Sequence, residues 1–178
     1  MKSDNTYKFV FTALCIAIGF ILVQTGKMIP TANANSILLP MHIPVLICGL
    51  VCGMRYSVIA GVSLPLVNFF LTGMPILYPI GLSMIFELAT YGLVIALLFK
   101  VTKGNVIISL LGSMIAGRIV YGIVATILYN FSNIPFGFSI FISGAFITAL
   151  PGIVIQLLII PLIWKSLKKS NLVMLQSH

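Results

Sequence analysis

Two ionisable side chains lie inside long apolar segments, where charged residues are rare. Glu87 lies in the apolar segment 80–99, and Arg118 lies in the segment 106–129. A charge at the bilayer centre costs about 2.5–3.5 kcal/mol on insertion scales, so such residues usually face the interior of a helix bundle and have partners there. They either form an ion pair that only locks two helices together, or face a cavity and orient a polar ligand. The second interpretation is favoured, and one pair can do both.

The two charges are expected at similar depths in the membrane. Glu87 is seven residues from Ile80, the outer end of its segment, and is therefore about 10 Å deep at about 1.5 Å per residue. Arg118 is eleven residues from Tyr129, its own outer end, and is about 16 Å deep by the same rise. A short turn joins the two segments as antiparallel neighbours. The difference of about 6 Å is within reach of an arginine side chain.

Polar and aromatic residues flank both charges. Tyr91 follows Glu87 by four residues, and Tyr121 follows Arg118 by three, so each lies on the same helix face as its charge. Asn68, near the outer end of the third apolar segment, can join the same layer. Each residue alone is ordinary in a membrane helix. Together they are typical of a small polar site with aromatic walls, of the size that holds a vitamin.

His42 is the last candidate for substrate binding, and it precedes the second apolar segment at the outer surface. A lone histidine is more often a cap or loop residue, and no nearby ligand completes a metal site. Cys15, Cys48 and Cys52 lie in apolar runs and are interpreted as small buried hydrophobic residues. We therefore expect no metal, no cofactor and no catalytic residues.

The amino-acid composition indicates that the chain is an integral membrane protein. Of the 178 residues, 60% are apolar and only 7% are charged, and the mean hydropathy is +1.20. Soluble domains carry about 25% charged residues, and no single core of this size can hide so much apolar surface. We predict an all-α integral membrane protein, a compact bundle of six transmembrane helices that forms a single domain, 1–178.

Six apolar segments make up the predicted bundle. The second and third are short and are separated only by Arg55 and Tyr56. They are either a tight helical hairpin or a single segment broken at Gly53. We favour the hairpin, because Pro44, Gly53 and Pro65 interrupt the stretch. The predicted spans are Tyr7–Gln24, Ile43–Met54, Ser57–Thr72, Ile80–Phe99, Val106–Tyr129 and Ile140–Trp164.

The distribution of basic residues predicts the orientation of the bundle. With the N-terminus in the cytoplasm, the inside positions hold eight basic residues and the outside loops hold only Lys27. Basic residues mark cytoplasmic loops, so both termini are expected inside. The net charge of +8 is then a topology signal, and no nucleic-acid partner is expected. The inside residues are Lys2, Lys8, Arg55, Lys100, Lys103, Lys165, Lys168 and Lys169.

The loops on the two sides of the bundle differ in length and composition. The outside loops 25–42, 73–79 and 130–138 are long and contain prolines, whereas the inside loops are short turns. Prolines reduce the entropy lost when a loop becomes ordered, and binding residues are often carried by loops on a rigid scaffold. We predict that these three loops form a structured lid over an outward-facing site.

Small residues line one face of the first span. Ala13 and Ala17 are four residues apart, and Gly19 follows them. Small residues at this spacing let another helix approach closely. The face either packs within the chain or docks a separate membrane subunit.

Four stretches together resemble the substrate-binding S components of energy-coupling factor (ECF) transporters. The resemblance covers nearly the whole chain, in its length, its six spans and the Ala-xxx-Ala pattern at Ala13 and Ala17. The stretches are Leu38-Leu-Pro-Met-His-Ile-Pro-Val-Leu-Ile-Cys-Gly49, Leu71-Thr-Gly-Met-Pro75, Phe86-Glu-Leu-Ala-Thr-Tyr-Gly92 and Ala116-Gly-Arg-Ile-Val-Tyr-Gly122.

The resemblance implies a substrate-capture subunit without enzymatic activity, located in a bacterial plasma membrane. Such a subunit binds a vitamin or related micronutrient near the outer face. Through Ala13 and Ala17 it docks onto a transmembrane coupling subunit that carries two ATPase subunits. Arg118 suits a carboxylate, as in pantothenate or nicotinate, and Glu87 suits a ring amine, as in a pyrimidine precursor. Neither inference about the substrate holds if the two side chains pair with each other.

Two other functions are alternatives. A small intramembrane enzyme, with Glu87 as acid and base, lacks a second catalytic group at the same depth unless Arg118 or His42 serves. A membrane assembly factor would use the Glu87–Arg118 pair only as a structural lock.

Overall fold

The structure is a computed structural model, and it describes residues 2–30, 34–131, 143 and 148–170. The described residues are helical apart from turns, and six helices are long and apolar enough to cross a membrane. The predicted all-α bundle of six membrane helices is therefore confirmed. The helices are α1 (Lys2–Lys27), α2 (Ala34–Leu38), α3 (His42–Cys52), α4 (Met54–Thr72), α5 (Leu82–Val101), α6 (Val106–Phe131) and α8 (Leu150–Lys169), and a π-helical turn, η1 (Leu77–Gly81), precedes α5.

The last helix differs from the predicted span. It continues five residues past the predicted end at Trp164, to Lys169, because lysines interact favourably with the carbonyl end of a helix. Most of the predicted start of this span, 140–142 and 144–147, lies outside the described residues.

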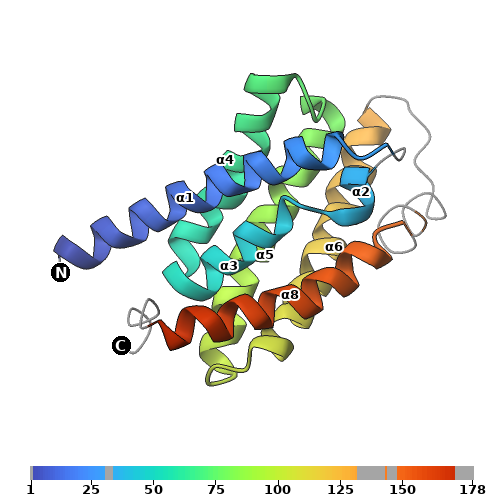
Figure 1. Cartoon of the computed structure of the whole chain (residues 1–178). Coiled ribbons are helices and arrows are strands. Elements are labelled where there is room, and N and C mark those ends of the chain that lie inside the picture. Colours follow the sequence, from blue (N-terminus) through green and yellow to red (C-terminus); the bar gives the residue numbers. More distant parts are fainter. Residues whose placement is uncertain (1, 31–33, 132–142, 144–147, 171–178) are drawn as a thin grey trace.

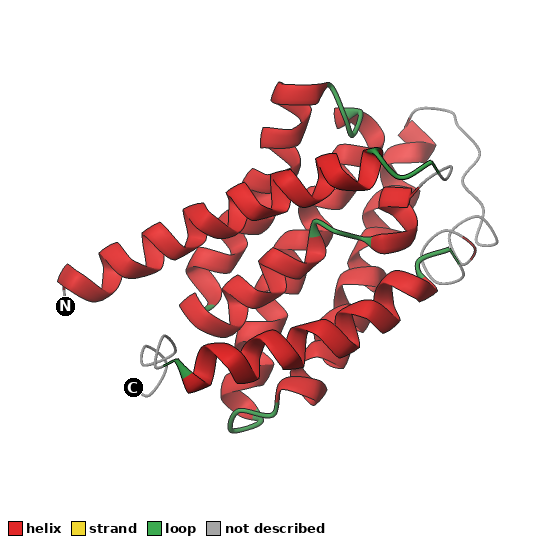
Figure 2. Ribbon diagram, viewed as in Figure 1, coloured by secondary structure: helices red, strands yellow, loops and turns green. Residues whose placement is uncertain are grey.

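The helices pack around α3 and α5. α5 contacts α3, α4 and α6, while α1 and α8 both contact α3. Figures 1 and 2 show α1 and α8 crossing the front of the bundle, with α1 beginning and α8 ending at the same end. Nine of the eleven residues of α3 are buried, so this short helix lies in the core while the longer helices surround it.

Two glycines allow α4 to turn away from α3 and to pack closely on α5. Gly53 separates α3 from α4 with φ +85°, a conformation that side chains disfavour. At Gly61, a Cβ atom would lie 2.6 Å from the backbone of Leu88 on α5, closer than real contacts allow. The hydroxyl of Ser57 on α4 donates a 2.8 Å hydrogen bond to the Gly92 carbonyl of α5. The backbones of α4 and α5 therefore approach each other closely, as is common between membrane helices.

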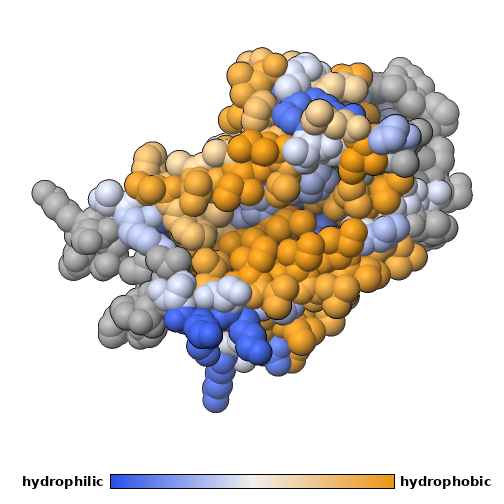
Figure 3. Space-filling model, in the orientation of Figure 1, coloured by the Kyte–Doolittle hydropathy of each residue, from blue (hydrophilic) through white to orange (hydrophobic). Residues whose placement is uncertain are grey.

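The outer surface of the bundle is apolar. In Figure 3, hydrophobic residues cover most of the visible face, and hydrophilic residues gather toward its two ends. Exposed side chains on α1 include Phe9 and Leu14, which are 69% and 52% exposed. Ala13 and Ala17 are exposed on the same helix. They therefore do not pack within the described bundle, which leaves this face free for lipid or for another subunit.

Candidate functional site

Glu87 and Arg118 form a buried ion pair between α5 and α6. Nη1 of Arg118 lies 2.9 Å from Oε1 of Glu87, and the two side chains are 6% and 2% exposed. Removing one partner of such a pair leaves an uncompensated buried charge and costs about 3–5 kcal/mol. The two residues thus meet, as the rise per residue along their helices predicts. Because they pair with each other, the sequence-based reasons for a ligand carboxylate at Arg118 and a ligand amine at Glu87 no longer hold.

His42 adds a third polar side chain to this pair. It is the first residue of α3, and its Nε2 lies 3.5 Å from Oε1 of Glu87. Its ring meets the ring of Tyr91 edge to face, with centroids 5.0 Å apart. The interpretation of His42 as a lone cap or loop residue is wrong, because it is only 2% exposed and faces Glu87. Its position near the outer membrane surface stays a prediction. We call His42, Glu87, Tyr91 and Arg118 the polar cluster.

A small residue on α6 makes room for the aromatic side of this cluster. Gly117 precedes Arg118, and a Cβ atom there would lie 3.0 Å from two ring atoms of Tyr91. The Tyr91 ring therefore packs directly on the α6 backbone. Since Tyr91 is one helical turn after Glu87 on α5, the glycine allows the ring and the ion pair to occupy the same interface.

A turn held by α8 positions His42. Leu39 has a positive φ of 51° between α2 and α3. Its carbonyl accepts a 3.1 Å hydrogen bond from the His42 backbone N–H and a 3.4 Å bond from Nε2 of Gln156 on α8. Gln156 is 1% exposed and was not among the residues singled out in the sequence. The sequence feature that could have identified Gln156 is an amide side chain within an apolar span, because such polar groups commonly form hydrogen bonds to neighbouring helices.

Several polar atoms of the cluster have no hydrogen-bond partner among the described residues. They are Nε and Nη2 of Arg118 and both ring nitrogens of His42; Oε1 of Glu87 has only the charge contacts described above. A buried polar group without a partner costs about 1–3 kcal/mol, and charged groups cost more. Such groups in a native structure need an explanation. The Nε and Nη2 groups of Arg118 can each donate a hydrogen bond to a polar group that is not among the described residues.

The two remaining candidates lie in different surroundings. Asn68 is fully buried on α4, where Oδ1 accepts a 3.3 Å bond from Gln24 and Nδ2 donates to the Leu64 carbonyl. It thus links α4 to α1. Tyr121 is partly buried on α6 and lies near enough to interact electrostatically with Glu87 and Arg118.

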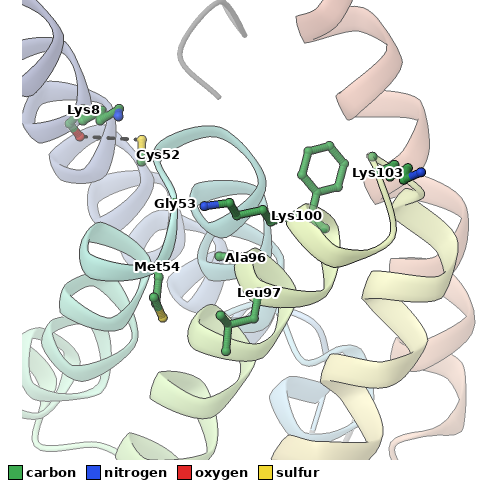
Figure 4. A pocket seen from close by; sticks show the side chains of 10 residues that line it. Lys8, Cys52, Gly53, Met54, Ala96, Leu97, Lys100 and Lys103 are labelled. Atoms are coloured by element: carbon green, nitrogen blue, oxygen red, sulfur yellow. Dashed lines mark hydrogen bonds between the residues drawn. The ribbon is translucent and has the colours of Figure 1, made fainter. Parts of the chain in front are cut away.

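A groove of about 490 Å³ opens at the other end of the molecule. It lies between α1, the α3–α4 corner and the end of α5, and Lys100 reaches from α5 toward Gly53 (Figure 4). Lys100 is thirteen residues beyond Glu87, about 20 Å along the helix. Three lysines line the groove, Lys8, Lys100 and Lys103, all predicted to face the cytoplasm. It is therefore separate from the polar cluster.

The described residues contain no group of three or more histidine, cysteine or acidic side chains that could hold a metal ion. Cys15, Cys48 and Cys52 are free thiols and are all buried, as predicted for small hydrophobic residues.

Six membrane helices around a buried polar cluster define a multi-pass membrane protein whose apolar core contains a small polar site. Residues 8–164 match the family described as "ECF transporter, substrate-specific component". The match covers most of the chain, and the chain therefore belongs to this family. Neither a curated protein nor a solved structure matches it significantly. The chain is accordingly a transport subunit that binds a small-molecule substrate and works with a partner ECF module.

Proposed function

We propose that this substrate-specific component captures a water-soluble vitamin or related micronutrient from the extracellular side, at the polar cluster. Pantothenate, nicotinate and a pyrimidine precursor are the candidate substrates. The proposed binding residues are the polar cluster, Glu87, Arg118, Tyr91 and His42, together with Tyr121 on α6 and Asn68 on α4, whose amide is bonded to Gln24 and Leu64. The observation that carries the proposal is the set of buried polar nitrogen atoms on Arg118 and His42 that lack a hydrogen-bond partner among the described residues.

A purely structural role explains these atoms less well. A guanidinium that only locked two helices would gain most from two parallel hydrogen bonds to both carboxylate oxygens. Arg118 instead contacts Oε1 of Glu87 through Nη1 and leaves Nε and Nη2 without a hydrogen-bond partner among the described residues. A polar ligand would satisfy these donors and recover the free energy lost on burying them.

We further propose that the chain delivers its ligand inward together with a transmembrane coupling subunit and two ATPase subunits in a bacterial plasma membrane. The exposed Ala13 and Ala17 on α1 support a docking face, because they leave a shallow strip where a partner helix can approach.

Reconstitution in vesicles tests whether the chain captures the ligand and the partner subunits drive its transport. Vesicles with the chain alone should bind radiolabelled vitamin and accumulate none, and vesicles that also contain the coupling module and ATP should accumulate it. The matched variants are Arg118→Ala in the site and Arg55→Ala, an exposed arginine at the α3–α4 corner. We expect Arg118→Ala to abolish binding and uptake, and Arg55→Ala to preserve binding. Accumulation by the chain without ATP or a partner would refute the proposal.

A further inference from the structure

The contact between Arg118 and Glu87 uses only one side of the guanidinium. Nη1 lies 2.9 Å from Oε1 of Glu87. Nε and Nη2, which lie along another edge of the planar group, are buried and have no hydrogen-bond partner among the described residues. The arginine is thus held by Glu87 and presents a second edge with two parallel donors.

That edge matches a specific ligand chemistry. The rigid fork of an arginine fits two acceptor atoms in one plane, and a carboxylate provides two such oxygens at the right spacing. A ligand amine offers donors only, so it would leave Nε and Nη2 without partners and place a second positive charge beside Arg118.

Glu87 is poorly placed to receive a cationic ligand. Its Oε1 already faces Nη1 of Arg118 at 2.9 Å and Nε2 of His42 at 3.5 Å. An ammonium group at this oxygen would lie close to both basic side chains. A ligand carboxylate bound by Nε and Nη2 would instead use the donors of Arg118 that Glu87 does not contact.

We infer that the substrate carries a carboxylate, which Arg118 binds through Nε and Nη2 while Glu87 acts as a positioning residue for Arg118. The inference rests on the proposed function of the polar cluster and specifies its substrate class. Of the three candidate substrates, it favours pantothenate and nicotinate over the pyrimidine precursor.

The test measures ligand binding by the purified full-length chain with isothermal titration calorimetry. The probes with a carboxylate are nicotinate, pantothenate, biotin and folate, and those without one are nicotinamide, pantothenol, pyridoxine, thiamine and riboflavin. We expect the tightest ligand to be a carboxylate and its amide or alcohol counterpart to bind at least ten-fold more weakly. A tightest ligand without a carboxylate overturns this inference and leaves the proposed function intact. Absence of binding to every probe overturns both.

Two conservative variants separate the roles of the ion pair. Arg118→Lys keeps the positive charge but loses the fork, and should weaken carboxylate binding at least ten-fold. Glu87→Gln keeps an oxygen acceptor for Nη1 but loses the charge that holds Arg118, and should weaken carboxylate binding by less than Arg118→Lys does. Loss of binding in Glu87→Gln, with normal thermal unfolding, would show that Glu87 contacts the ligand and would overturn the inference. If Arg118→Lys does not fold, the carboxylate binding of a folded Glu87→Gln variant alone decides whether the inference holds.

Discussion

His42 lies 3.5 Å from Glu87, although 45 positions separate the two residues in the chain. This contact joins the first residue of α3, just after the α2–α3 turn, to the ion pair between α5 and α6. The side chain of Gln156 on α8 donates a hydrogen bond to the Leu39 carbonyl in this α2–α3 turn. Four parts of the bundle therefore converge on one buried cluster, and a change in any of them should reach the ligand.

Reversing the two charges separates a binding site from a structural lock. The double variant Glu87→Arg with Arg118→Glu keeps an ion pair between α5 and α6 and should recover much of the stability lost in either single variant, about 3–5 kcal/mol. The reversed pair presents its donors on the wrong helix, so ligand binding should be lost. Thermal unfolding and calorimetry check the two effects. Normal ligand binding by a folded double variant would favour the lock.

Gln156 should influence the ligand without belonging to the cluster. Gln156→Leu removes the bond to the Leu39 carbonyl and should lower the free energy of unfolding by about 0.5–1.5 kcal/mol. Because the same carbonyl bonds to the His42 backbone, we also expect ligand affinity to fall several-fold. Thr102→Val is the control, since it removes a 2.7 Å hydrogen bond to the Leu98 carbonyl at the far end of α5. Equal affinity losses in both variants would contradict a specific role of the turn.

The contact between Gly117 and Tyr91 predicts a second indirect effect. In Gly117→Ala, the new Cβ atom meets a ring that is only 2% exposed, so Tyr91 must move. Overpacking of this kind costs about 1–3 kcal/mol, and we expect weaker ligand binding. The matched control is Gly112→Ala on the same helix, where the new atom meets the flexible end of Leu98. If both variants bind the ligand like the wild type, the Tyr91 position does not matter for the site.

The exposed alanines of α1 should matter for transport and not for capture. Ala13→Trp with Ala17→Trp fills the shallow strip and should block assembly with the coupling subunit, measured by co-purification. Ligand binding by the isolated chain should be unchanged, because both side chains are exposed on α1, a helix that contributes no residue to the polar cluster. Ile108→Trp, at a 53% exposed position on α6, is the control. Normal assembly of the double variant would place the docking face elsewhere.

Much of the fold could be predicted from the sequence because membrane helices obey simple rules of length and charge. The meeting of Glu87 and Arg118 followed from a rise of about 1.5 Å per residue along two adjacent helices. Local geometry of this kind needs no knowledge of the other helices. The break between the second and third spans was predicted at Arg55 and Tyr56, which are part of α4. The chain breaks at Gly53, whose φ of +85° suits only glycine well.

The position of His42 could not be predicted in the same way. Its burial depends on the packing of α3 against α5, which no sequence spacing encodes. The turn before it contains Leu39 at a positive φ, where glycine or asparagine would have been the usual signal. The bond from Gln156 crosses 117 positions and likewise depends on the assembled bundle.

The most direct test of ligand capture is native mass spectrometry of the purified chain after incubation with the water-soluble vitamins and their precursors. The expected result is one bound ligand per chain, with a higher unfolding temperature in its presence. Arg118→Ala should lose the bound species, whereas Arg55→Ala should retain it. A well-folded chain that retains no ligand from the panel, or an Arg118→Ala variant that binds as the wild type does, would contradict capture at the polar cluster.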